Sequence, residues 1–126
     1  MALAFSRYAA LIFAIGLAIG EAVINWGNWQ WWPLWVIDYV IVFALIAGFS
    51  LSRDPRRAHA LTTAWTLAFG VFYMAFFVSL ESIREGQASF AEFRVVITLM
   101  GIMMALAGAG ALAAAYAYRQ AHKNSA

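Results

Sequence analysis

Apolar residues dominate four long stretches of the chain, and short polar segments separate them. The stretches run over residues 8–24, 33–51, 58–80 and 93–118. A helix needs roughly 20 apolar residues to cross the hydrocarbon core of a bilayer. None of the stretches alternates with the period of 2 that marks a barrel strand, and a helix satisfies its own backbone hydrogen bonds in lipid. The pattern predicts an all-α polytopic membrane protein, a single domain over residues 1–126 in which four transmembrane helices form an up-down bundle.

Polar residues between the stretches fit the ends of these helices. Asp54 precedes Pro55, which is typical of an N-cap followed by the first helical residue. Ser89 and Glu92 have the spacing of a capping box at the start of the last helix. Gly86 suits the end of the helix before it. Because the connections are short, sequential helices are predicted to be antiparallel neighbours.

Composition agrees with a lipid environment and excludes several kinds of chemistry. Of the 126 residues, 65% are hydrophobic and 11% are charged, whereas roughly 25% of a soluble domain is charged. The chain has no Cys, which excludes disulfides, thiolate metal sites and thiol nucleophiles. His59 and His122 lie away from mid-membrane with no second ligand at metal spacing, so no metal or cofactor is predicted. No catalytic motif is present, and an enzyme is not the predicted class.

Basic residues collect at one end of the predicted bundle. Two of the eight, Arg84 and Arg94, fall at the opposite end. The other six are Arg7, Arg53, Arg56, Arg57, Arg119 and Lys123. By the positive-inside rule both termini face the cytoplasm, and the composition suits a bacterial inner membrane. These residues stand at the ends of apolar runs and not among clustered aromatics, so nucleic acid is not a predicted partner.

The first apolar stretch also resembles a signal peptide. Arg7 precedes an apolar run that ends in Gly20-Glu21-Ala22, which imitates a small-x-small cleavage site. The run is long for a signal peptide, and Glu21 is poorly placed for cleavage. A retained transmembrane helix is therefore the prediction.

Small residues are spaced for close packing of helices. Gly16 and Gly20 form a G-x-x-x-G motif in the first stretch. The last stretch has a small residue at every fourth position, namely Gly101, Ala105, Ala109, Ala113 and Ala117. Close approach of backbones supplies much of the attraction between helices in lipid. Both stripes predict packing within the bundle or an interface with a second copy or a larger membrane complex, and the two alternatives stay open.

Two acidic residues lie inside the predicted spans. Asp38 is about one and a half turns beyond the start of the second span, and Glu21 is near the outer end of the first with Asn25 one turn further. An ionised carboxylate at mid-bilayer costs roughly 2.5 to 3.5 kcal/mol, so each acid needs a partner. One prediction is a structural ion pair with Arg94. The other is a pair of carboxylates that line a polar cavity and carry a proton or bind a cation.

Glu81 is a further candidate at the outer end of the third stretch. The residues on its helix face are Thr62, Thr66, Gly70, Tyr73 and Phe77. If this face points inward, hydroxyl groups descend from an acidic mouth toward the cytoplasm. In the alternative, each Thr hydroxyl bonds the carbonyl four residues earlier and needs no other partner.

Tryptophan is concentrated in the outer loop between the first two spans and at the start of the second span. The five residues are Trp26, Trp29, Trp31, Trp32 and Trp35. Indole rings are stable at headgroup depth, so an aromatic belt accounts for them. The same rings could instead form an outer platform for a lipid, isoprenoid, quinone or sugar, with Asn25, Asn28 and Gln30 as hydrogen-bonding neighbours.

These observations favour a non-enzymatic integral membrane protein. We expect an accessory or self-associating subunit whose outer, Trp-rich acidic face contacts lipid or a partner. The alternative is a small proton-coupled transporter or channel that uses Asp38 and Glu21. An enzyme acting on a lipid-embedded substrate is the third expectation.

Overall fold

A computed structural model describes residues 1–26, 32–87 and 89–123, and all regular structure in these ranges is helical. The elements in chain order are α1 (Ala2–Asn25), α2 (Trp32–Leu51), the 3-10 helix η1 (Pro55–Arg57), α3 (Ala58–Arg84) and α4 (Phe90–Lys123). The predicted all-helical chain with four α-helices is confirmed. α1, α3 and α4 extend beyond the apolar stretches that predicted them, because helical hydrogen bonding continues past the apolar run.

Three helical segments are long and apolar enough to cross a membrane. They are Ala2–Val23, Pro55–Arg84 and Phe93–Lys123. In α2 the apolar run found among the described residues, Trp35–Leu51, is shorter. These lengths and compositions indicate an integral membrane protein.

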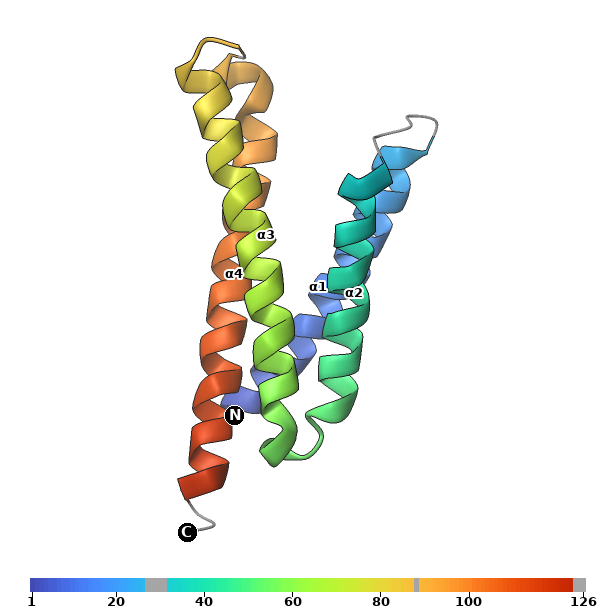
Figure 1. The fold of residues 1–126 in the computed structure, drawn as a ribbon, viewed down its shortest axis with the longest axis vertical. Helices are drawn as coiled ribbons and strands as arrows, with labels where there is room; N and C mark the ends of the chain where they lie inside the picture. Colours follow the sequence, from blue (N-terminus) through green and yellow to red (C-terminus); the bar gives the residue numbers. More distant parts are fainter. Residues whose placement is uncertain (27–31, 88, 124–126) are drawn as a thin grey trace.

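The four α-helices form two hairpins, α1 with α2 and α3 with α4 (Figure 1). The hairpins meet at the end that holds both chain termini and the α2–α3 connection, which we call the terminal end. Toward the opposite end, here called the loop end, they diverge, while α3 and α4 stay side by side. In the predicted up-down bundle the two hairpins therefore pack against each other toward the terminal end and are separated at the loop end.

A buried chain of hydrogen bonds joins three helices near the terminal end. The indole Nε1 of Trp65 in α3 donates to Oγ of Ser6 in α1 over 3.0 Å, and this Oγ donates to the carbonyl of Gly110 in α4 over 2.8 Å. Neither Trp65 nor Ser6 has exposed surface. A Cβ at position 110 would lie 2.7 Å from Cδ2 and Nε1 of the indole, so only glycine fits beneath the ring. We call these three residues the hairpin lock.

An aromatic layer lies next to the hairpin lock. The ring of Phe13 in α1 meets Trp65 edge-on at 5.2 Å and Phe72 edge-on at 5.6 Å. Edge-to-face contacts between aromatic rings stabilise an interior beyond the burial of the rings. A second close contact joins α2 to α3, where a Cβ at Gly48 would stand 3.0 Å from Cα of Leu61.

Helix ends follow the local signals in the sequence. Oδ1 of Asp54 accepts the backbone N–H of Arg56 over 3.0 Å, which confirms Asp54 as an N-cap, although it caps η1. Gly86 has φ of +72°, a conformation that L side chains rarely adopt. The N–H of Gly86 bonds the carbonyl of Ile83 and the N–H of Gln87 bonds that of Ser82, which closes α3 with a Schellman motif.

Candidate functional site

Three of the predicted site residues come together within the α1–α2 hairpin. Nδ2 of Asn25 donates to the carbonyl oxygen of Glu21 and to its Oε2, both over 2.9 Å. Across the hairpin, the carboxyl group of Asp38 lies beside that of Glu21, close enough for the two groups to interact. We call Glu21, Asn25 and Asp38 the carboxyl cluster.

The positions of the two acids follow from helix periodicity. Glu21 is four residues beyond Leu17 and seven beyond Ala14, both buried on the packing face of α1. Asp38 precedes buried Ile41 by three residues and buried Leu45 by seven. Each acid therefore extends the face through which the two helices pack, so the carboxyl groups meet between the helices. Both side chains are partly buried.

The chemistry of the carboxyl cluster follows from its donors and acceptors. A hydrogen bond between two carboxyl groups requires a proton on one of them. The amide of Asn25 supplies a donor to Glu21, while its Oδ1 is buried and has no hydrogen-bond partner in the part of the chain that the structure describes. Two neighbouring carboxyl groups can share a proton when one of them is protonated, and Oδ1 of Asn25 is a further acceptor beside them.

Arg94 does not belong to this cluster. It lies on α4 of the other hairpin, is exposed and makes no ion pair with any described residue. The structural ion pair predicted for Arg94 with Asp38 or Glu21 is absent from the described part of the chain. The physical reason is the divergence of the two hairpins toward the loop end (Figure 1).

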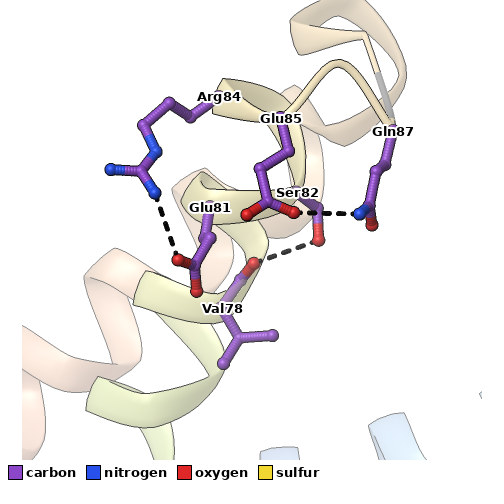
Figure 2. Close-up of polar contacts among 6 residues, drawn as sticks. All are labelled: Val78, Glu81, Ser82, Arg84, Glu85 and Gln87. Carbon is purple, nitrogen blue, oxygen red and sulfur yellow. Dashed lines mark hydrogen bonds and ion pairs between the residues drawn. The ribbon is translucent and has the colours of Figure 1, made fainter.

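Glu81 also lies apart from the carboxyl cluster. Figure 2 shows its Oε1 beside Nη2 of Arg84, and this ion pair spans 3.3 Å with both side chains exposed. One turn further along the chain, Nε2 of Gln87 donates to Oε2 of Glu85 over 2.9 Å. A pocket of about 330 Å³ lined by Phe77, Leu80, Glu81 and Arg84 opens on this surface. A surface ion pair of this kind contributes little to stability.

The hydroxyl-bearing face of α3 points outward and does not form an inward acidic mouth. Thr66, Tyr73 and Phe77 on this face are exposed. Oγ1 of Thr62 bonds the carbonyl of Ala58 over 3.1 Å, and Oγ1 of Thr66 bonds that of Thr62 over 2.9 Å. These threonines satisfy their own hydroxyl groups, as the alternative predicted.

The predicted aromatic platform is described only in part. Trp26 is 88% exposed, and Trp35 packs edge-on against Tyr39 at 6.0 Å. Trp29, Trp31 and the side chain of Trp32 lie outside the described residues. The platform therefore stays a prediction.

The small-residue stripes are used unevenly. A Cβ at Gly16 or Gly20 would meet nothing within 4 Å, so no described neighbour packs against either residue. In α4 a Cβ at Gly101 would lie 3.2 Å from Cε2 of Phe76, whereas Ala105 and Ala109 are exposed and Ala113 is partly buried. The contact of α4 with the other helices runs along a neighbouring face that includes Ala107, Gly110 and Ala114, all buried.

Sequence reasoning missed the hairpin lock. Trp65 lies within the third predicted span, away from the headgroup depth at which tryptophan is usually found. Its N–H needs an acceptor there, and this requirement is the signal from which the sequence could have predicted a buried polar contact. Among the residues that the structure describes, no three His, Asp or Glu side chains gather as a metal site. No protein-family model matches the chain, and neither does any curated protein or solved structure.

Proposed function

We propose that the chain is a small, non-enzymatic protein subunit, located in a bacterial inner membrane, that associates with other copies of itself through α1. It crosses the bilayer four times with both termini in the cytoplasm. Its Trp-rich, acidic loop end faces the outside and contacts lipid or a partner. The open Gly16-x-x-x-Gly20 face of α1 is the observation that supports self-association.

Orientation is supported by the distribution of charge. The α2–α3 connection and both termini share one end of the molecule (Figure 1), and six of the eight Lys and Arg residues belong to these segments. An excess of Lys and Arg in short connections favours the cytoplasmic side.

The G-x-x-x-G face of α1 has the form of a helix-packing surface without a described occupant. No described atom beyond the adjacent residues and the backbone of α1 lies within 4 Å of a Cβ placed at Gly16 or Gly20. The nearby side chains of Ile12, Ile15 and Ile19 are exposed. Because lipid is as apolar as these side chains, burial alone does not drive helices together, and close backbone contact at small residues does. A second copy in the same orientation offers an identical face, so the contact is self-complementary.

The test adds bulk to this face without disturbing the chain itself. Gly16→Leu and Gly20→Leu should each keep the fold, because no described atom beyond the adjacent residues and the backbone of α1 itself lies within 4 Å of the new Cβ. Both should lower the oligomer fraction that size-exclusion chromatography with light scattering detects in mild detergent. Gly70→Leu is the matched control, since Gly70 in α3 is equally open. A wild-type chain that is monomeric in detergent and in nanodiscs, or an oligomer that both α1 variants retain, refutes the proposal.

The side-by-side position of the Glu21 and Asp38 carboxyl groups between α1 and α2 favours a second candidate function, proton-coupled transport or conduction. A carboxyl pair in a membrane segment is typical of proton relays. Asp38→Asn and Glu21→Gln should each reduce pH-driven flux in proteoliposomes without loss of folding. Glu81→Gln removes an exposed acid from the other hairpin and should leave flux unchanged. Equal flux in the wild type and both cluster variants refutes this function.

A further inference from the structure

Four arginines from two parts of the sequence lie at the terminal end. Arg7 lies in the second turn of α1, and Arg53, Arg56 and Arg57 belong to the segment that joins α2 to α3. Figure 1 places the start of α1 and the α2–α3 connection at the same end of the molecule. We call these residues the arginine cluster.

Contacts with α2 fix the position of Arg7 within this cluster. Its Nε donates to the carbonyl oxygen of Phe49 over 3.2 Å, and its guanidinium carbon lies 4.7 Å from the centroid of the Phe49 ring. The ring of Tyr8 lies at 6.1 Å from the same Phe49 ring. Phe49 is in the last turn of α2, where the helix dipole attracts a cation. Arg53 follows Phe49 by four residues, so Arg7 is held beside the start of the arginine-rich connection.

No described carboxylate neutralises the arginine cluster. Among the described residues the structure contains an ion pair between Glu81 and Arg84. This pair is near the end of α3, at the loop end, far from the arginine cluster. The nearby acid, Asp54, accepts the backbone N–H of Arg56 and serves as the cap of η1. Within the described ranges the hydrogen bond of Arg7 runs from Nε to Phe49, which leaves Nη1 and Nη2 as further donors. Arg53, Arg56 and Arg57 are exposed.

We propose that the arginine cluster binds the phosphate of an anionic phospholipid headgroup. A guanidinium group matches two phosphate oxygens with two parallel donors, and Arg7 is already oriented by Phe49. Exposed Tyr8 and Leu51 next to the cluster offer apolar surface to the acyl chains of the same lipid. The site adds lipid recognition to the proposed subunit, and it does not depend on self-association.

The experiment measures lipid binding to the full chain in detergent by native mass spectrometry. Phosphatidylglycerol should bind about tenfold more tightly than phosphatidylcholine. Arg7→Gln should reduce phosphatidylglycerol binding roughly fivefold, which corresponds to one basic residue at an anionic headgroup. The double variant Arg56→Gln with Arg57→Gln should reduce the affinity for phosphatidylglycerol more than Arg7→Gln does. It retains the contact of Arg7 with Phe49, so it tests the site even if Arg7→Gln weakens folding.

The matched control removes the same charge at the same end of the molecule. Arg119→Gln with Lys123→Gln, both exposed and near the end of α4, should leave phosphatidylglycerol affinity unchanged. An equal loss in this control shows diffuse charge attraction and overturns the site. Equal affinity of the wild type for the two lipids also overturns it. Competition by millimolar inorganic phosphate would assign the cluster to a soluble anion instead of a lipid.

Discussion

Gly110→Ala should weaken the contact that holds the two hairpins together. An ideal Cβ at this position would lie 2.7 Å from Cδ2 and Nε1 of Trp65. The indole is fully buried and meets Phe13 at 5.2 Å, so it can move only by displacing its neighbours. Movement also separates Nε1 from Oγ of Ser6. The hairpin lock therefore has no cheap way to accept one methyl group.

The expected loss combines three terms. Overpacking of a well-packed interior costs about 1 to 3 kcal/mol. Loss of the hydrogen bond between Trp65 and Ser6 costs about 1 kcal/mol. Ala is better than Gly within a helix by about 1 kcal/mol, which offsets part of the loss. The free energy of unfolding should therefore fall by about 1 to 3 kcal/mol.

Reversible unfolding of the full chain in mixed micelles, titrated with SDS and followed by far-UV circular dichroism, measures this loss. Gly108→Ala is the matched control on the same helix, because its Cβ would lie 3.5 Å from Phe69, an ordinary contact. Gly108→Ala should leave stability unchanged or raise it by up to about 1 kcal/mol. In a Trp65→Leu background, Gly110→Ala should cost nothing, since the obstructing ring is gone. A Gly110→Ala chain as stable as Gly108→Ala would refute the reasoning.

Three further substitutions test other contacts of the fold. Ser6→Ala leaves the buried N–H of Trp65 without its acceptor. In the same SDS titration it should lower the free energy of unfolding by about 1 to 3 kcal/mol. A stability equal to that of the wild type would contradict the hairpin lock. Gly48→Ala places a Cβ 3.0 Å from Cα of Leu61, a backbone atom that cannot rotate away. Overpacking of about 1 to 3 kcal/mol, less about 1 kcal/mol for the better helix propensity of Ala, should give a net loss of up to about 2 kcal/mol. A gain in stability would show that α2 shifts freely on α3. Asp54→Ala removes the side-chain cap of η1, which contributes about 1 kcal/mol of stability. It should speed tryptic cleavage after the adjacent arginines. An unchanged cleavage rate would show that the cap does not order this connection.

Local features of the fold could be read from residue order. Apolar runs located the four α-helices, and Asp54 and Gly86 marked helix ends, because caps and the positive φ of a C-terminal glycine depend on neighbours in sequence. The Glu21–Asn25 contact is also local, since residues four apart share a helix face.

Part of the candidate site depends on how helices pair. Asp38 meets Glu21 because α1 and α2 form a tight hairpin, in which both acids extend the packing faces. The expected alternative, Arg94 as the partner, was wrong for the described part of the chain because the α3–α4 hairpin diverges at that end. Nothing in the spacing of charges predicts that divergence.

Residue order alone thus established the class of the molecule, its helices and their ends. It did not decide which helix faces pack, because in lipid the outward and inward faces of a helix are both apolar, and the hydrophobic pattern loses the contrast that marks a core in water. Residues 39–49 of α2, for instance, contain no charged or amide side chain on any face. Only the tertiary structure showed that α3 turns Thr66 outward and Trp65 inward, that Ser6 and Gly110 complete the hairpin lock, and that Gly16 and Gly20 are left open.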